Sequence, residues 1–214
     1  MLQQYAQKLC LYLTEKQLTQ FAIYRRELLQ WNARTNLISE KSSREIINRH
    51  FLDSLTALEM ISGMNVKIID IGCGAGFPGI PLKIAAPSLQ LYLLEANRKK
   101  ISFVKHIVRL LNLSHTVVLH ERAENLLKDN QWKDFFAIVI SRATFKLPEI
   151  LPLAAFFLEP GGLLIALKGH DLAEEFLQAS AIAARYRFSK LFQYDTNNEV
   201  LGISRKIIVG KKIK

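Results

Sequence analysis

The feature that most constrains the fold is an alternation of short apolar runs with helical segments, which begins after residue 65. The strand-like runs occupy residues 67–71, 90–94, 116–120, 137–140 and 163–167, and the helical segments between them occupy residues 80–86, 98–111, 123–127 and 147–157. Such alternation is typical of a parallel sheet with helices on both faces. A further helix, residues 171–186, precedes strands at residues 188–194 and 205–209, whose short connection favours an antiparallel hairpin. We therefore predict a Rossmann-like α/β fold with a seven-stranded, mostly parallel sheet.

The first 64 residues have a helical pattern throughout. Thr14 with Gln17, and Ser42 with Glu45, each form a capping box, the pair of polar residues that begins many helices. Apolar residues follow both boxes at helical spacing, so each box should begin an amphipathic helix. A short helix is also predicted at residues 3–13. We divide the 214 residues into a helical extension, 1–64, and a Rossmann-like core, 65–214, which together form one compact domain.

A glycine-rich turn directly follows the first predicted strand. It reads Asp70-Ile71-Gly72-Cys73-Gly74-Ala75-Gly76-Phe77-Pro78-Gly79. Glycine lets a ligand approach the backbone closely, and the free N–H groups of the helix that follows face the turn. Ligands of such sheets bind beyond the carboxyl ends of the strands. We interpret the turn as a ligand site; a tight structural turn without a ligand is the alternative.

Two ligands fit the residues of the turn. The stretch from Gly74 to Gly79 satisfies G-x-G-x-x-G, which by itself suggests a dinucleotide. Asp70 extends the motif to D-x-G-x-G-x-G and favours S-adenosylmethionine, because a carboxylate can join the polar network around its cationic methionine end. Glu95, at the end of the second predicted strand, can accept hydrogen bonds from both ribose hydroxyls of either ligand. S-adenosylmethionine is the favoured interpretation, with a nicotinamide-dependent oxidoreductase as the alternative.

The charge balance points to a polyanionic partner. The chain carries 29 basic and 19 acidic residues, a net charge of +10. Such a surplus favours nucleic acid, because neutralised phosphates release counterions, although a merely basic protein would have the same composition. No apolar run approaches the roughly 20 residues that span a bilayer, and the first residues lack the pattern of a signal peptide. We therefore expect a cytoplasmic protein without a membrane partner.

Several motifs recur in the order typical of one family. They are Trp31-Asn32, Asn36-Leu37-Ile38-Ser39, Arg49-His50-Phe51-Leu52-Asp53-Ser54, Asp70 through Gly79 with Ile80-Pro81-Leu82, Leu94-Glu95-Ala96-Asn97-Arg98-Lys99-Lys100, Ser141-Arg142-Ala143 and Leu167-Lys168-Gly169. With them the chain resembles the bacterial RsmG family, also called GidB, of class I S-adenosylmethionine-dependent methyltransferases. The resemblance implies methyl transfer to N7 of guanine 527, in the 530 loop of 16S rRNA, with S-adenosylhomocysteine as the product. It also implies the small ribosomal subunit as partner and a monomer without a stable protein partner; it leaves open whether naked rRNA or the particle is methylated.

The resemblance also implies a set of cofactor contacts. These contacts add to the residues that the glycine turn and the end of the second strand already suggest. The full set of predicted cofactor-binding residues is Asp70, Gly72, Gly74, Gly76, Phe77, Glu95, Ala123, Glu124 and Arg142. Glu95 stands where many relatives carry Asp, and the longer carboxylate still suits the ribose. Another RNA or a small molecule as the methyl acceptor, or a noncatalytic RNA-binding module, remain alternatives.

The chemistry of guanine N7 agrees with the residues present. N7 carries a free lone pair and no proton, so its methylation needs positioning more than acid–base help, and we assign no general base or acid. Many enzymes that methylate exocyclic amines have an Asn/Asp-Pro-Pro-aromatic loop after the fourth strand. Ser141, Arg142 and Ala143 begin this segment here instead. Neither cysteine follows the fourth or fifth strand, as cytosine-C5 methylation would require.

Three residues near the strand ends are candidates for positioning or RNA contact. We interpret Arg142 as positioning substrate or cofactor, with a structural ion pair as the alternative. Lys168 would contact an RNA phosphate or be a solvated charge. Phe145 could stack on a base, although a core role is favoured.

A polar group in the N-terminal region has helical spacing. His50, Asp53 and Ser54 fall at i, i+3 and i+4, so they share one helix face. For Asp53 and Ser54 we favour hydrogen bonds that fasten this helix to the sheet. His50 either does the same or points into the ligand crevice and contacts RNA. No second histidine lies at ligand spacing, so no metal site is predicted.

Overall fold

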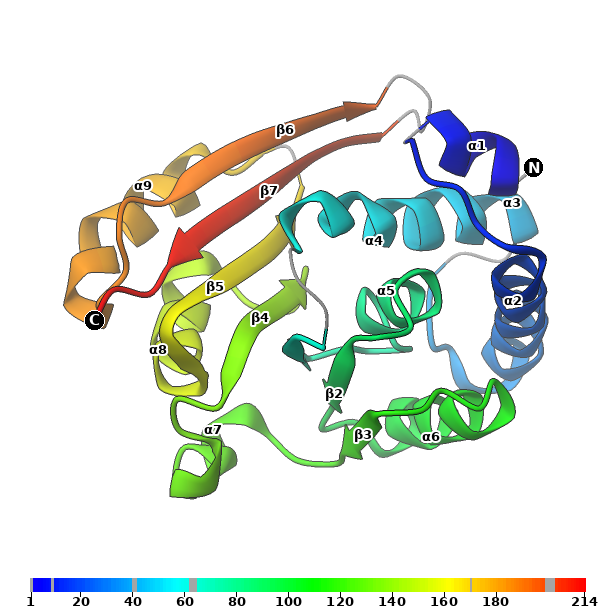
Figure 1. Ribbon diagram of the computed structural model, residues 1–214, viewed down its shortest axis with the longest axis horizontal. Coiled ribbons are helices and arrows are strands. Elements are labelled where there is room, and N and C mark those ends of the chain that lie inside the picture. The colour runs from blue at the N-terminus through cyan, green and yellow to red at the C-terminus, as the bar shows by residue number, and fades with distance from the viewer. Residues whose placement is uncertain (1, 9, 40–41, 62–64, 170, 199–202) are drawn as a thin grey trace.

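A central sheet organises the protein. The computed structural model describes residues 2–8, 10–39, 42–61, 65–169, 171–198 and 203–214. Its strands are β1 (Lys67–Ile71), β2 (Gln90–Leu94), β3 (Thr116–Leu119), β4 (Phe136–Arg142), β5 (Leu158–Lys168), β6 (Phe192–Asn198) and β7 (Ile203–Lys211). They form one seven-stranded sheet in the order β3-β2-β1-β4-β5-β7-β6 (Figure 1). Neighbours from β3 to β5 pair in parallel, whereas β7 pairs antiparallel with both β5 and β6. The predicted Rossmann-like fold is confirmed.

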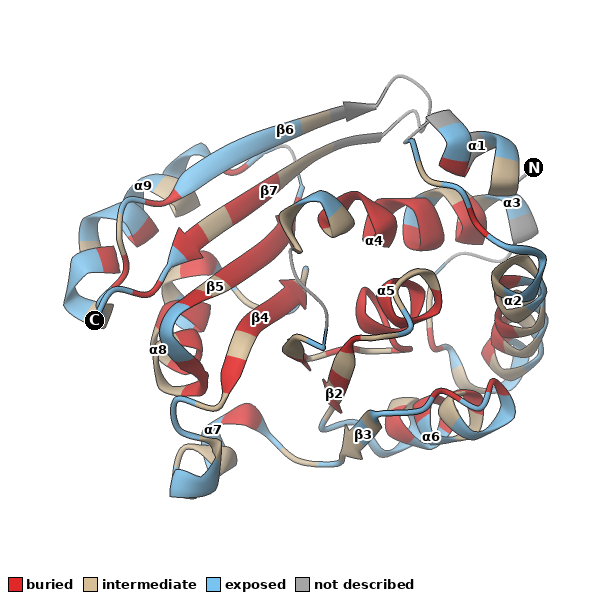
Figure 2. Cartoon of the chain, viewed as in Figure 1, coloured by how far each residue is buried: buried red, intermediate tan, exposed pale blue. Residues whose placement is uncertain are grey.

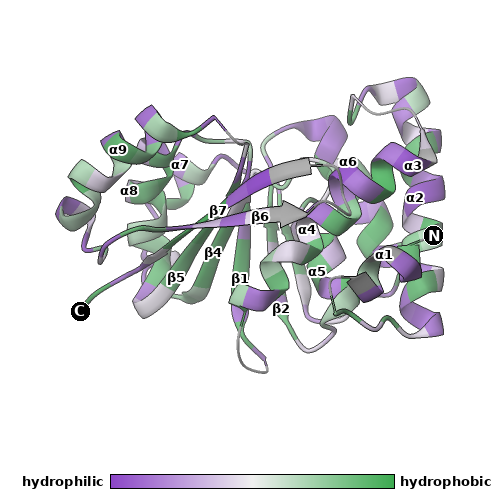
Figure 3. Ribbon diagram, turned by 90° about the horizontal axis from the view of Figure 1, so that it is seen from above, coloured by the Kyte–Doolittle hydropathy of each residue, from purple (hydrophilic) through white to green (hydrophobic). Residues whose placement is uncertain are grey.

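Helices cover both faces of this sheet. One face carries α7 (Ala123–Leu126), α8 (Leu147–Phe157) and α9 (Ala173–Ile182), and the other carries α5 (Gly79–Ala85) and α6 (Arg98–Leu110) (Figure 3). Short 3-10 helices follow α7 at Asn130–Trp132 and α9 at Ala183–Tyr186. The elements at the centre, such as β4, α4 and α5, are mostly buried, while the outer sides of α2 and α9 face solvent (Figure 2).

The N-terminal region consists of α1 (Leu2–Lys8), α2 (Glu15–Thr35) and one long helical segment. That segment runs through α3 (Ser43–Ile46), a π-helical turn (Ile47–Leu52), α4 (Asp53–Leu55) and a 3-10 helix (Thr56–Met60). Both predicted capping boxes form, since Gln17 N–H donates to Thr14 Oγ1 and Glu45 N–H donates to Ser42 Oγ. No helix among the described residues is long and apolar enough to cross a membrane.

An aromatic cluster joins the N-terminal helices to the glycine turn. Tyr24 on α2 is fully buried, and its ring lies 5.3 Å from that of Phe51 and 5.4 Å from that of Phe77. Its hydroxyl donates a hydrogen bond of 2.6 Å to the carbonyl of Ala75 in the turn. Residues 1–64 therefore share a core with residues 65–214; the boundary between these two predicted parts falls at residues 62–64, outside the described ranges.

Some predicted bounds were wrong near the C-terminus. The strand predicted at residues 188–194 is β6, which begins only at Phe192. Arg187 adopts the left-handed conformation, with a φ of +58°, and reverses the chain after the 3-10 helix. Phe188 is then buried and makes only an isolated bridge with Lys212. Its apolar character resembles that of a strand residue, but it serves to anchor a turn. The turn of the predicted hairpin includes residues 199–202, which are not described.

Candidate active site

The glycine turn connects β1 to α5, and its neighbours in the fold hold its backbone in place. Gly72 N–H and Cys73 N–H both donate to the carbonyl of Leu94, at 2.9 and 3.0 Å. Gly72 has a φ of +72°, and a Cβ atom there would lie 2.4 Å from Thr144 Cγ2, so no side chain fits. Gly74 also has a positive φ, +59°, but a Cβ atom there would meet nothing within 4 Å. The backbone at Gly74 therefore borders open space.

That open space is a cavity of about 470 Å³ at the carboxyl ends of β1, β2 and β4, a size usual for small-molecule sites. Of the predicted cofactor-binding residues, those that line it are Gly72, Gly74, Phe77, Glu95, Ala123, Glu124 and Arg142. Among the predicted RNA-contact residues, His50 and Phe145 line it as well. The sequence motifs thus meet in one place, although they come from distant parts of the chain.

Glu95 presents an oriented carboxylate to the cavity. Its Oε2 accepts a hydrogen bond of 2.8 Å from Gly74 N–H, and its Oε1 accepts one of 2.7 Å from Asn97 N–H. An ionised carboxylate has about four acceptor positions, so about two remain for ribose hydroxyls. The open space beside the backbone of Gly74, called the cradle below, and the fixed carboxylate of Glu95 together fit the adenosine part of S-adenosylmethionine.

Asp70 and Gly76 do not line the cavity, contrary to the predicted contacts. Asp70 is completely buried behind the turn, where its Oδ2 accepts a hydrogen bond of 2.8 Å from Gly79 N–H. Its Oδ1 is buried and has no hydrogen-bond partner among the described residues. Gly76 lies under Ile80 and Tyr24, whose atoms would be 2.4 and 2.9 Å from a Cβ atom. Both residues support the shape of the turn from behind.

Burial raises the pKa of the Asp70 carboxyl from its usual 3.8 to about 7. Folding therefore favours the protonated form, and this contribution to stability is lost as the pH rises from about 4 to about 7. Asp70→Asn removes the titrating group and keeps the shape. We expect the wild type to lose free energy of unfolding relative to this variant as the pH rises through that window. Chemical denaturation at several pH values measures the difference, and a difference that stays constant contradicts the assignment.

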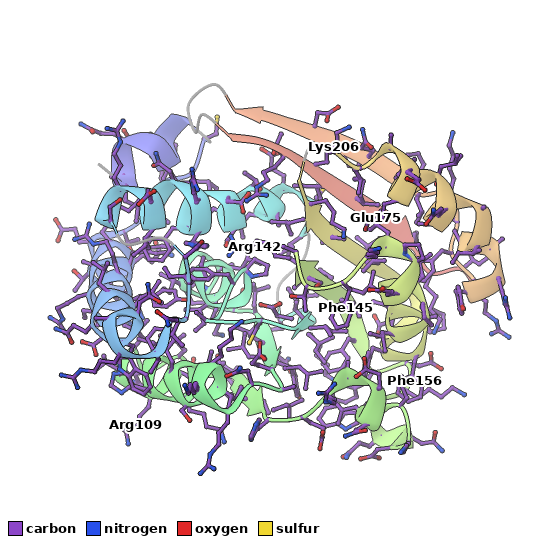
Figure 4. The ribbon with its side chains drawn as sticks, turned by 180° about the vertical axis from the view of Figure 1, so that it is seen from behind. Arg109, Arg142, Phe145, Phe156, Glu175 and Lys206 are labelled. Atoms are coloured by element: carbon purple, nitrogen blue, oxygen red, sulfur yellow. The ribbon has the colours of Figure 1, made fainter. Side chains whose placement is uncertain are left out.

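Arg142, at the end of β4, combines a place in the cavity wall with an ion pair. Its Nη1 donates to the Arg49 carbonyl and to Asp53 Oδ2, both at 3.0 Å, and its Nη2 donates to His50 Nδ1 at 2.7 Å. The guanidinium carbon lies 4.9 Å from the centre of the Phe77 ring. Figure 4 shows Arg142 beside α4. The ion pair, which the sequence offered as the alternative, is therefore present, and the positioning role of Arg142 stays a prediction.

Asp53 fastens the N-terminal helical segment to two strands of the sheet. Its carboxylate is only 1% exposed; Oδ2 accepts from Arg142 on β4, and Oδ1 accepts from Arg205 Nε on β7 at 3.0 Å. The fastening expected of Asp53 is therefore present. Ser54 differs, because its hydroxyl donates to the carbonyl of His50 within the same helix. Arg205 also lines the cavity and was not anticipated, since no local motif surrounds it.

His50 and Lys168 have different surroundings. The His50 ring lies 4.6 Å from that of Phe77, nearly parallel to it, and forms part of the cavity wall. Lys168 does not line the cavity, and its side chain is only 11% exposed. Its ammonium donates to the Phe145 carbonyl and pairs with Glu175 on α9, both at 2.5 Å. The solvated charge considered for Lys168 is wrong, and its ammonium instead ties α9 to the end of β5.

Gly74→Ala tests the cradle. The left-handed backbone should cost about 1 kcal/mol of stability, while the added methyl group occupies cofactor space. We expect the affinity for S-adenosylhomocysteine to fall at least about tenfold, measured by calorimetric titration. Gly161→Ala is the matched control, because Gly161 has a φ of +89° and open space but lies away from the cavity. Equal affinities of the two variants would contradict the placement of the cofactor.

The strand order, the glycine turn after β1 and the carboxylate at the end of β2 define a class I S-adenosylmethionine-dependent methyltransferase. Similar folds occur in M. jannaschii TYW2 in complex with AdoMet (TM-score 0.57, 17% identity, 74% of this chain and 75% of that chain). They also occur in the precorrin-6y C5,15-methyltransferase of Geobacter metallireducens GS-15 (TM-score 0.55, 16% identity, 83% and 91%). The chain belongs to the family rRNA small subunit methyltransferase G (GidB), which matches residues 17–204.

Curated relatives agree with this family. The "Ribosomal RNA small subunit methyltransferase G" of Syntrophus aciditrophicus (strain SB) is 45% identical over 81% of this chain and 73% of its own length. The protein of the same name from Desulfitobacterium hafniense (strain Y51) is 36% identical over 96% of this chain and 85% of its own. The predicted family and the class of enzyme with its S-adenosylmethionine cofactor are confirmed. The nicotinamide-dependent alternative does not fit this family.

Proposed function

We propose that the protein transfers a methyl group from S-adenosylmethionine to N7 of guanine 527, in the 530 loop of 16S rRNA. The observation that carries the proposal is that motifs of one family, from Arg49 to Arg142, converge on a single cavity of cofactor size. The names of the relatives support ribosomal RNA of the small subunit as the substrate. The net charge of +10 suits such a polyanion.

Different residues of the cavity wall would contact different parts of the cofactor. Glu95 would hold the ribose, Gly74 would lie against the cofactor, and Gly72 and Phe77 would border its methionine part, with Ala123, Glu124 and Arg142 completing the wall. When bound, S-adenosylmethionine supplies an electrophilic methyl group on a sulfonium. Asp70 and Gly76 act indirectly in this proposal, because they shape the turn from behind.

The chain's own residues would catalyse the reaction by placement. Guanine N7 has no proton to remove, so no residue has to act as a general base, and in-line geometry decides the rate. Arg142 suits such a role because three acceptors, on Arg49, Asp53 and His50, fix the plane of its guanidinium. A fixed guanidinium positions a neighbouring base or cofactor with little loss of side-chain entropy.

The enzyme would act in the cytoplasm as a monomer on the small ribosomal subunit, with no membrane partner and no stable protein partner. Residues 1–64 would form a helical extension of the core at residues 65–214, and the shared aromatic cluster around Tyr24 supports one compact unit.

Labelled S-adenosylmethionine tests the proposal directly. Purified protein is incubated with small subunits, and in parallel with naked 16S rRNA, from cells that lack this methylation. We expect the label in an N7-methylguanine at position 527, and no label in subunits from cells that already carry the modification. The absence of label, or its appearance in another nucleotide, would overturn the proposal.

A further inference from the structure

Arg205 reaches the cavity from the last strand of the sheet. Its side chain is 30% exposed and forms part of the cavity wall. Its Nε donates to Oδ1 of the buried Asp53, whose other oxygen holds Arg142. The carboxylate therefore fixes two guanidinium groups side by side at the same cavity. Nothing in the proposed cofactor contacts uses Arg205.

The two arginines differ in the donors that they have left. Arginine has five N–H groups. Arg142 uses three of them within the protein and is 12% exposed. Arg205 uses one, its Nε–H, so both terminal amino groups, with four N–H bonds, have no partner among the described residues. The buried carboxylate of Asp53 therefore fixes Arg205 in the wall of the cavity, and the two terminal amino groups of Arg205 can donate hydrogen bonds to a ligand.

We propose that Arg205 recognises O6 of the target guanine and thereby selects guanine and places its N7. This inference rests on the proposed function. O6 lies next to N7 on the same edge of the base, and N7 itself must stay free to attack the methyl group. O6 is therefore the acceptor on that edge to which the protein can donate a hydrogen bond. Adenine carries an amino donor at this position, which would face the donors of Arg205.

The contact with Asp53 suits this role. Positive charge develops on the base as N7 is methylated, so an isolated cation beside it would oppose the reaction. The Asp53 carboxylate, 3.0 Å from Nε, reduces the positive charge of the Arg142 and Arg205 pair and leaves the terminal donors of Arg205 in place. Asp53 is thus a positioning residue, and Arg205 is the residue that would touch the substrate.

Lys206 provides a matched control. Side chains alternate across a strand, so Lys206, next to Arg205 on β7, lies on the opposite face of the sheet. Its ammonium lies 4.0 Å from Asp195, and the residue does not line the cavity. Figure 4 shows Lys206 on the outer hairpin of β6 and β7. Lys206→Ala removes one positive charge without changing the cavity.

The experiment compares three bases at the target position in reconstituted small subunits. Guanine has O6 and a 2-amino group, inosine keeps O6 without the amino group, and 2-aminopurine keeps the amino group without O6; all three have N7. For each enzyme we measure kcat/KM and divide the value for guanine by that for 2-aminopurine. Intrinsic differences in N7 reactivity enter this ratio equally for every enzyme, so they cancel between variants.

We expect the guanine to 2-aminopurine ratio of the wild type to exceed that of Arg205→Ala by about 10- to 100-fold. Lys206→Ala should keep the wild-type ratio, and inosine should be methylated within about threefold of guanine by the wild type. The affinity for S-adenosylhomocysteine should change less than about threefold in Arg205→Ala. If this variant does not fold, Arg205→Met, which keeps the apolar stem without donors, takes its place.

Each contrary result has its own meaning. An equal ratio in the wild type and the Arg205 variant overturns the inference. A large loss of affinity for S-adenosylhomocysteine overturns it in favour of a cofactor contact. A wild-type enzyme that leaves the guanine unmethylated refutes the proposed function itself, so the two failures are distinguishable.

Discussion

Arg142→Ala is expected to reduce the rate of methyl transfer by at least about 100-fold while the protein stays folded. Arg142 is fixed by the Arg49 carbonyl, Asp53 and His50, and its guanidinium lies over the Phe77 ring. Without it, the cavity wall loses the group that we propose positions the reacting partners, and small misplacements have large effects on an in-line reaction. The fold should survive because Asp53 keeps Arg205 as its partner.

Single-turnover rates, together with the melting temperature, measure this effect. Arg109→Ala is the control, because it removes the same charge from the exposed side of α6, away from the cavity (Figure 4). Near-normal turnover of Arg142→Ala would show that the residue is only structural. A melting temperature far below that of the control would show that the loss reflects unfolding.

The second large effect is expected from Asp53→Ala, which should lower the free energy of unfolding by about 3 kcal/mol. Its carboxylate is buried and pairs with two arginines, so its removal leaves two like charges side by side without this shared counter-ion. Removing one partner of a buried ion pair usually costs about 3 to 5 kcal/mol. We expect a value at the lower end because Arg205 is partly exposed and can be hydrated. Urea denaturation gives the difference in free energy.

Asp195→Ala provides the comparison for that variant. Asp195 is also paired with a cation on β7, but at 4.0 Å and with a side chain that is 51% exposed. Exposed pairs of this kind contribute about 0 to 1 kcal/mol. If the two variants lose the same stability, the buried carboxylate does not hold the helical segment to the sheet in the way its contacts indicate.

Local patterns predicted much of the fold. The bounds of β1, β2 and α8 agree with the expected ones, because apolar periodicity and the neighbouring glycine and proline residues are properties of short segments. The glycine turn likewise belongs to one segment, and its place at the cavity follows from the end of β1. The late start of β6 did not follow, since the burial of Phe188 depends on its bridge to Lys212.

The direction of side chains was harder to predict than their place in the chain. Asp70 lies in the expected turn, yet it points behind the turn toward Gly79 N–H. Lys168 is the last residue of β5, one residue beyond the predicted strand end, and its ammonium turns to Glu175 on α9. Arg205 and Asp53 are 152 residues apart, so no local pattern reveals their contact. Such pairings depend on the packing of whole elements.

The position of β7 has a consequence for the order in which the enzyme matures. This strand follows β6 in the sequence, yet it lies between β5 and β6 in the sheet and delivers Arg205 to the carboxylate of Asp53, 152 residues earlier in the chain. A growing chain that has reached only β6 therefore has an open edge on β5, and Asp53 lacks one of its two partners. The part of the cavity wall that Arg205 forms is therefore complete only after β7 has been synthesised and has inserted between β5 and β6.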